Sequence, residues 1–322
     1  MSLATALASY RRTGADYPWG DPVAPHGVPM EGWFWRISDA ATGRVVVVLC
    51  GVCHGASGPW TLVALAAAPG GFVRTAICAG AHVDAGGRVL SVPGGALSAD
   101  AGGLRVVLGD DARLDVALRE QSDWPRRVFG GLGPGHGVPR LGQYWHPHLL
   151  GAAVSGEVVL GDERWDLGGA SAYAEKNWGA GFPSRWWWGQ AQGFDTGDAC
   201  VAFAGGDVRL GPLAMAPTAV VARVEGKVVR LGVPLAAVSA SSDGGAWRVR
   251  ARGPRHEVEL EGDSNGSEPH SLPVPLPDER RVVLTAQQHF AGHLRLTVRR
   301  GRRTLFRGES EVAALERGGG RP

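Results

Sequence analysis

The stretch TAVVARVEGKVVRLG, residues 218–232, carries the pattern that decides the fold. Two valine-rich runs flank Glu225-Gly226, and a glycine-containing pair between apolar runs is typical of a β-hairpin turn. The same texture extends along the chain in both directions, whereas helical periodicity is hard to find. Further runs of this kind are RVVVVLCGV (44–52), FVRTAIC (72–78), LRVVLGDDARLDVAL (104–118), GEVVLGDERWDLGG (156–169), ACVAF (199–203), WRVRARGPRHEVELEG (247–262) and HLRLTVRRGRRTLFRGES (293–310). We therefore predict an all-β fold.

Composition agrees with this fold and excludes several classes of function. The 50 Gly and 21 Pro among 322 residues are scattered, which indicates many turns between short strands. A net charge of +2 gives no reason to expect a nucleic acid partner. No segment reaches the roughly 20 apolar residues that span a bilayer. The start, MSLATALASYRRTG, lacks the regions of a signal peptide, and four cysteines fit reduced thiols, so we expect a cytoplasmic protein.

The strands form two similar sets, each opened by an aromatic triplet. EGWFWRIS (31–38) opens the first set and SRWWWGQAQ (184–192) opens the second, and each set ends in a hairpin followed by Ser. Regularly spaced strands favour a sandwich or a barrel, and the repeated order favours internal duplication. We predict two similar antiparallel β-barrels in tandem, residues 1–183 and 184–322.

The chain contains twelve tryptophans, more than a core of this size requires, which suggests that some of them line a binding site. Alternation along an extended strand gives two sets of residues that share a face: Trp186, Trp188, Gln190 and Gln192 in the second triplet motif, and Glu31, Trp33 and Trp35 in the first. A half-polar cavity explains glutamines in line with tryptophans better than a packed core does. Plain packing is the alternative, and we assign Trp187, on the opposite face, to packing.

Several motifs resemble the tocopherol cyclase family. The motifs are Ala174-Glu175-Lys176-Asn177-Trp178-Gly179, then Phe182-Pro183, then Trp186-x-Trp188-x-Gln190, together with Glu31-Gly32-Trp33-Phe34-x-Arg36, GQYWHPH (142–148) and the ending LERGGGRP. The motifs bracket most of the chain, which is shorter than the plant cyclases. Within the Gly-rich ending, Arg321 stands at a position where we expect no inserted residue. The resemblance implies a pair of lipocalin-like barrels and cofactor-free chemistry on an apolar prenylated or polyene small molecule. In that chemistry a prenyl double bond is protonated, and a phenolic oxygen closes on the cation to form a chroman.

Protonating an alkene requires a carboxylic acid that is shielded from water, because burial raises the pKa of a carboxyl. Glu175 and Glu31 are the candidate acids, each next to large apolar groups. If residues 173–177 are extended, Tyr173, Glu175 and Asn177 share one face, and Lys176 shares the other with Trp178. The alternative for either glutamate is a salt bridge that pins the barrels together, to Arg36, Arg185 or Lys176.

A third cluster comprises Tyr144, Trp145, His146 and His148. His146 could orient the phenol hydroxyl or take its proton during ring closure. The alternative is a hydrogen-bonded histidine near a proline turn. His146 and His148 could also bind a metal from one strand face, but the sequence shows no third ligand, so we predict no metal site.

The leading hypothesis is a cyclase or isomerase that needs no cofactor. The alternatives are a lipid or pigment carrier that uses the same cavity, and a hydratase or pericyclase of a natural-product pathway. Arg299, Arg300, Arg302 and Arg303 form a hairpin tip that is either solvated or in transient contact with anionic lipid. The candidate catalytic residues are Glu175, Glu31, His146 and Asn177, and the candidate substrate-binding residues are Trp33, Trp35, Tyr144, Trp145, Tyr173, Trp178, Trp186, Trp188, Gln190 and Gln192.

Overall fold

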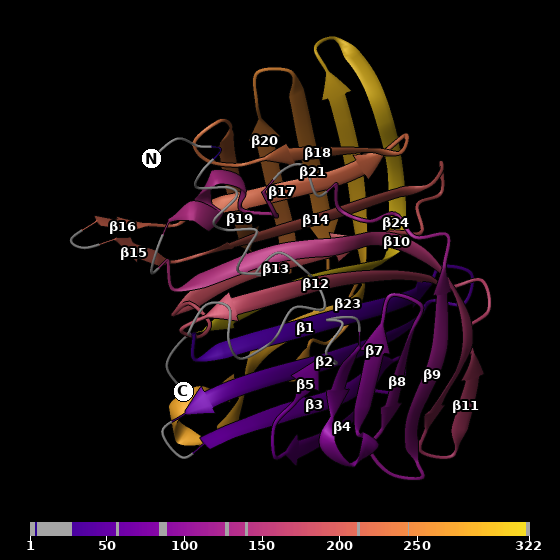
Figure 1. Ribbon diagram of the computed structural model, residues 1–322. Coiled ribbons are helices and arrows are strands. Elements are labelled where there is room, and N and C mark those ends of the chain that lie inside the picture. The colour runs from indigo at the N-terminus through magenta and orange to yellow at the C-terminus, as the bar shows by residue number, and fades with distance from the viewer. Residues whose placement is uncertain are drawn as a thin grey trace.

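The computed structural model consists almost entirely of antiparallel strands (Figure 1). It describes residue 4 and residues 28–55, 58–83, 89–125, 129–138, 141–210, 213–243 and 245–319. Most of the start of the chain, on which the absence of a signal peptide was predicted, lies outside the described residues, as does Arg321. Short 3-10 turns are η1 (Pro93–Gly95), η2 (Gly133–Gly137) and η3 (Pro277–Glu279).

The first large sheet contains the strands up to Gly179. They are β1 (Met30–Asp39), β2 (Arg44–Gly55), β3 (Gly58–Ala68), β4 (Phe72–Cys78), β5 (His82–Val83), β6 (Leu90–Val92), β7 (Leu97–Asp100), β8 (Gly103–Val107), β9 (Ala112–Arg119), β10 (Gln143–Leu160), β11 (Glu163–Asp166) and β12 (Ser171–Gly179). The hydrogen-bonded order is β4-β3-β2-β1-β12-β10-β9-β8-β7-β6-β5, and β11 pairs with β10.

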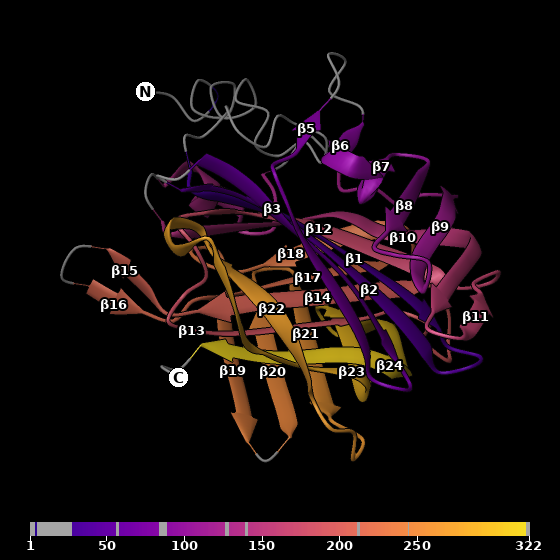
Figure 2. The ribbon, with the colours of Figure 1, turned by 90° about the horizontal axis from the view of Figure 1, so that it is seen from below.

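The second large sheet begins at Arg185. Its strands are β13 (Arg185–Ala191), β14 (Ala199–Gly206), β17 (Thr218–Val224), β18 (Lys227–Leu231), β19 (Ala237–Asp243), β20 (Ala246–Arg252), β21 (His256–Asp263), β22 (His270–Leu276), β23 (Arg281–Arg300) and β24 (Arg303–Gly319). Their order is β18-β17-β14-β13-β24-β23-β21-β20-β19, and β22 pairs with β23. The small hairpin of β15 (Val208–Leu210) and β16 (Leu213–Met215) projects from the body (Figure 2).

The two large sheets share one topology. In each, the opening strand pairs with the closing strand, β1 with β12 and β13 with β24. Each sheet curls into an almost closed, lipocalin-like barrel, so the prediction of an all-β fold with two similar antiparallel barrels in tandem is confirmed. The division between the sheets falls after Gly179 and before Arg185. That the two barrels are separate domains stays a prediction.

Three apolar cores explain the nearly continuous burial of the opening strands. Trp33, Trp35 and Ile37 of β1 pack in the core of the first sheet. Phe34, on the opposite face, packs in a core that lies between the two sheets. A third core lies within the second sheet and includes Phe203. Strands buried on both faces read as apolar runs, which is how the aromatic triplets appear in the sequence.

Polar side chains also join the sheets. Arg36 of β1 donates to Oε1 of Gln190 on β13 at 2.9 Å and to the carbonyl oxygen of Phe290 on β23 at 2.6 Å. Gln192 donates to the carbonyl oxygen of Ser171 at 2.6 Å. Arg36 thus joins the two barrels through the Gln190 amide and the backbone, whereas the predicted alternative was a salt bridge to a glutamate. Buried donors need such partners, so these bonds set the relative position of the sheets.

Candidate active site between the two sheets

A cavity of about 1180 Å³ opens between the two sheets. The interior of each barrel holds an apolar core of its own. The wall of this cavity is formed by residues of both barrels. Among its residues are Trp33, Phe34, Tyr144, Trp145, Glu175 and Asn177 from the first half of the chain, and Trp186, Trp188, Arg230, Leu272 and Glu316 from the second.

Glu175 is the most heavily hydrogen-bonded carboxyl in this wall. Its Oε2 accepts from Nε1 of Trp145 at 2.7 Å, from the hydroxyl of Tyr173 at 2.6 Å and from Nε1 of Trp188 at 2.9 Å. Its Oε1 accepts from Nδ2 of Asn177 at 3.1 Å. Burial raises the pKa of Glu175, and the four hydrogen bonds oppose that rise because they stabilise the carboxylate. The site therefore combines a buried carboxyl with four side-chain hydrogen-bond donors that already point at it.

Strand alternation and sheet pairing explain how these donors converge. Tyr173, Glu175 and Asn177 lie on one face of β12, as the sequence predicted. Trp145 comes from the neighbouring strand β10, and Trp188 comes from β13 of the second sheet. The indole of Trp188 thus carries a hydrogen bond across the junction of the two barrels.

Glu316 on β24 is a second carboxyl in the cavity wall, and the sequence analysis did not single it out. Its Oε1 accepts from Nε1 of Trp186 at 2.7 Å, and its Oε2 accepts from Nε2 of Gln288 at 2.7 Å. Burial, and then the negative charge of Glu175, raise the pKa of Glu316 to about 7, against the two hydrogen bonds. The signal that could have found it was the glutamate inside the quoted ending LERGGGRP.

The glycines after Glu316 have a steric role. Gly318 pairs with Trp186 across the β13–β24 ladder. A Cβ atom at residue 318 would run into the indole ring of Trp186. Gly318 therefore leaves the space in which Trp186 lies while it donates to Glu316.

Glu31, the other predicted acid, lies away from Glu175. Its Oε1 is 3.4 Å from Nζ of Lys176, and both side chains are fully buried. The Lys176 ammonium also lies 5.2 Å from the ring centre of Trp33 and 5.7 Å from that of Trp178. Glu31 thus forms the ion pair with Lys176 that was one alternative to catalysis, but the pair lies within the first sheet and does not join the two barrels. Glu31 is absent from the cavity wall.

The remaining predicted binding residues divide into two groups. Trp33, Tyr144, Trp145, Trp186 and Trp188 border the cavity, whereas Trp35, Tyr173, Trp178, Gln190 and Gln192 do not. Tyr173 acts on the site through Glu175. Trp178 stacks on Tyr144 with ring centres 5.5 Å apart, so it supports the wall from behind. Gln190 accepts from Arg36 and belongs to the junction of the sheets.

The histidines of the third cluster, His146 and His148, lie outside the cavity wall. His146 is buried and lies edge-on to Trp124, with ring centres 5.5 Å apart, and is absent from the cavity wall. Burial, and then the charge of Lys176, lower the pKa of His148 to about 3, which keeps its ring neutral. Within the described residues no group of three His, Cys, Asp or Glu side chains could hold a metal ion.

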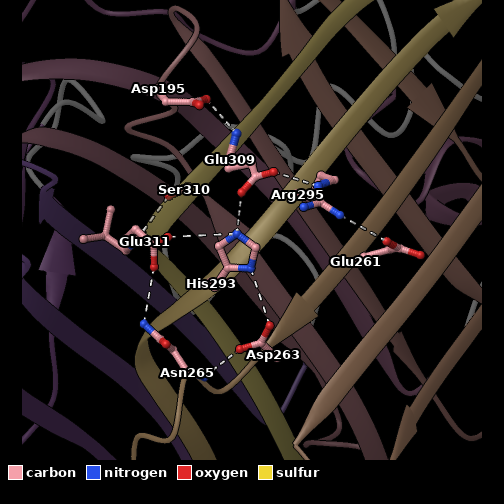
Figure 3. Close-up of polar contacts among 10 residues, drawn as sticks. Asp195, Glu261, Asp263, Asn265, His293, Arg295, Glu309, Ser310 and Glu311 are labelled. Atoms are coloured by element: carbon pink, nitrogen blue, oxygen red, sulfur yellow. Dashed lines mark hydrogen bonds and ion pairs between the residues drawn. The ribbon is translucent and has the colours of Figure 1, made fainter.

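A separate polar network lies on the second sheet, outside the cavity wall (Figure 3). Nε2 of His293 lies 3.0 Å from Oε2 of Glu309, and its Nδ1 lies 3.4 Å from Oδ2 of Asp263. Arg295 donates to the other oxygen of Glu309 at 2.8 Å. Hydrogen bonds from His293 and Arg295 lower the pKa of Glu309, opposite to the shift of the cavity carboxyls. This network is a solvated set of ion pairs.

The basic hairpin tip forms as the sequence predicted. β23 ends at Arg300 and β24 begins at Arg303, and the side chains of Arg300, Arg302 and Arg303 are exposed. Arg299 donates to Glu259 on β21. Contact of this tip with lipid stays a prediction. In the described part of the chain, no helix has the length and apolar character needed to cross a membrane.

Comparison with known proteins places these features in a family. The model of the family "Tocopherol cyclase-like" matches residues 144–319, a span that contains Glu175 and Glu316. A probable tocopherol cyclase of Oryza sativa subsp. japonica is 30% identical over 193 residues, which cover 56% of this chain and 41% of the rice protein. The tocopherol cyclase of Zea mays is 29% identical over 194 residues, 56% of this chain and 40% of the maize protein. The matched segments thus span about two fifths of these relatives.

Solved structures share the fold at low sequence identity. CghA, crystallised with Sch210972, superposes with a TM-score of 0.64 at 11% identity, over 91% of this chain and 88% of that one. Kievitone hydratase from Nectria haematococca superposes with a TM-score of 0.51 at 12% identity, over 89% of this chain and 88% of that one. These likenesses support the tandem-barrel fold alone. Because the family match covers more than half of the residues, the chain belongs to the tocopherol cyclase-like family.

Proposed function

We propose that this protein is a cofactor-independent enzyme that closes a ring in an apolar alkene substrate by adding a proton in the cavity between the two sheets. The observation that carries the proposal is Glu175, a carboxyl that is only 4% exposed, accepts four hydrogen bonds and lies in a tryptophan-lined wall. Burying a carboxyl is costly even when it is hydrogen-bonded, and a buried carboxyl with a shifted pKa in a cavity wall is a candidate functional group.

The substrate class we propose is a prenylated aromatic quinol. Two relatives in the same family are named tocopherol cyclases, and the cavity wall is mostly apolar. Proton addition to the prenyl double bond leaves a tertiary cation, and the phenolic oxygen then forms the new C–O bond. Trp186 and Trp188 each present an aromatic ring to this cation, and such contacts contribute roughly 0.5–2 kcal/mol.

The carboxyls define the chemistry of the site. Protonating an alkene needs an acid whose pKa is raised by burial, and Glu175 and Glu316 both meet that requirement. Asn177 and Tyr173 orient Glu175 through its two oxygens. His146 has no part in this proposal, because it does not border the cavity.

The proposal is tested by incubating the protein with a methyl-phytyl-benzoquinol in deuterated water and analysing the products by mass spectrometry. We expect a chroman isomer of the quinol that carries one deuterium on carbon. Glu175→Gln should lower turnover by about 10²-fold or more while ligand affinity, measured by quenching of tryptophan fluorescence, stays within a few-fold. Glu309→Gln, on the solvated network, is the matched control and should keep the wild-type rate.

Each other outcome points to a different function. Quenching without any product would favour a carrier that uses the same cavity without chemistry. A product heavier by one water would favour a hydratase, in which water traps the same cation. Full turnover by Glu175→Gln would remove this carboxyl from the reaction.

A further inference from the structure

Glu175 and Glu316 lie on corresponding strands of the two sheets. Each lies on the closing strand of its sheet, and each pairs across the ladder with an aromatic residue of the opening strand. Glu175 pairs with Phe34 of β1, and Glu316 pairs with Trp188 of β13. The rings of Phe34 and Trp188 meet edge to face, with centres 5.1 Å apart. The closing strands of the two sheets therefore each deliver a carboxyl to one cavity.

Their hydrogen bonds are unequal. Oε2 of Glu175 accepts three donors, more than its two lone pairs can receive in ideal geometry, and Oε1 accepts a fourth. The indole donors have no acceptor atom, so they favour the carboxylate form of Glu175. Glu316 accepts one donor on each oxygen, which leaves room for a proton on either one. Glu316 is also partly exposed to the cavity, whereas Glu175 is buried.

The surroundings of Glu316 add to this difference. The other titratable or charged side chains in the cavity wall are Cys50, Tyr144, Glu175, Arg185, Asp207, Arg209 and Arg230. Among these groups, it is the charge of Glu175 that raises the pKa of Glu316. An ionised Glu175 thus disfavours a second negative charge at Glu316, as in other carboxyl pairs that share one site.

We propose that the two carboxyls form an unequal pair, in which Glu316 holds the proton that is given to the alkene and Glu175 stays ionised to stabilise the cation. This division of roles rests on the proposed function for its substrate. The proton leaves Glu316 and the π electrons of the alkene form the new C–H bond. A phenolic lone pair then forms the C–O bond, and the phenolic proton returns to the Glu316 carboxylate. No atom is gained or lost overall.

The pair can be tested without substrate by infrared difference spectroscopy of the full chain. We expect the C=O stretch of a protonated carboxyl to be present below neutral pH and to disappear with a midpoint near pH 7, the pKa of Glu316. Glu316→Gln should remove this titrating band. Glu175→Gln should keep the band and move its midpoint to lower pH, because the repelling charge is gone. Glu309→Gln is the matched control and should leave the band unchanged.

Turnover separates this inference from the proposed function. With a quinol that the protein cyclises, we expect the wild-type rate to fall tenfold per pH unit above about 7, and Glu316→Gln to lose at least 10²-fold in rate. A titrating band that survives Glu316→Gln, or one that vanishes in Glu175→Gln, would overturn the unequal pair. So would a Glu316→Gln variant with wild-type turnover. If no quinol reacts while the band behaves as described, the pair stands and the proposed substrate fails.

Discussion

Glu175 and Glu316 lie on the closing strands of two sheets that share one topology, yet they differ in chemistry. Glu175 has four donors, three of them on a single oxygen, and Glu316 has two. Each closing strand brings a carboxyl to the cavity wall, and the neighbouring side chains make the two environments unlike. The comparison shows that the number of donors and the charge nearby, more than position in the fold, set the state of a carboxyl.

A third carboxyl, that of Glu309, allows a comparison between a solvated and a buried glutamate. Glu309 lies on the same strand as Glu316 but belongs to the network of His293 and Arg295. Its pKa is lowered by those hydrogen bonds, whereas burial raises the pKa of Glu316. One strand thus carries glutamates that are shifted in opposite directions.

Of the variants described below, Gly318→Ala is expected to have the largest effect on stability and turnover. The added methyl group meets the indole of Trp186, so the ring must move and its hydrogen bond to Glu316 is lost. We expect a loss of about 1–3 kcal/mol in the free energy of unfolding, measured by urea denaturation, and a drop in turnover of at least tenfold. Gly102→Ala is the control, because a Cβ there would only reach ordinary contact with Asp100. Equal stability of the two variants would contradict the steric role of Gly318.

A matched pair of tryptophan variants should give an intermediate effect. Trp186→Phe removes one of the two donors to Glu316, which should raise its pKa by about one unit. Trp188→Phe removes one of the four donors to Glu175 and should move the Glu316 midpoint less. The measurement is the infrared titration midpoint of the protonated carboxyl. A larger shift in Trp188→Phe would reverse the assignment of the two carboxyls.

The smallest effect is expected at His293. Burial would lower its pKa, but hydrogen bonds and charge from Glu309, Glu311 and Asp263 outweigh burial and raise it. A histidine whose folded pKa exceeds its unfolded value stabilises the fold below the unfolded pKa, and the gain disappears as pH rises through the folded pKa. We expect His293→Ala to destabilise the protein by up to about 1 kcal/mol at pH 5.5 and by less at pH 8.5.

His256 provides the control of opposite sign in the same denaturation series. Burial, and then the charges of Arg300 and Arg255, lower its pKa. Its unfolded state therefore binds the proton more strongly, so any stability linked to His256 is lost as pH falls below the unfolded pKa. If His293→Ala and His256→Ala showed the same pH trend, the ion pairs of His293 would not control its titration.

The sequence was sufficient for the strands, for their grouping into two sets and for the shared face of Tyr173, Glu175 and Asn177. These features follow from turn residues and from the alternation of side chains between the two faces of a strand, which are local properties of the chain. Trp186 and Trp188 were predicted to share a face for the same reason, and both border the cavity.

The alternation of side chains along one strand does not show which part of the protein each face of that strand packs against. Phe34 and Trp35 are adjacent and both buried, yet one faces the other barrel and one faces its own core. The ion pair of Glu31 with Lys176 arises from the pairing of β1 with β12, two strands that are more than a hundred residues apart in the sequence. Glu175 and Glu316 reach one cavity wall because the two sheets pack against each other. Side-chain alternation along a single strand carries no information about strand pairing or about that packing.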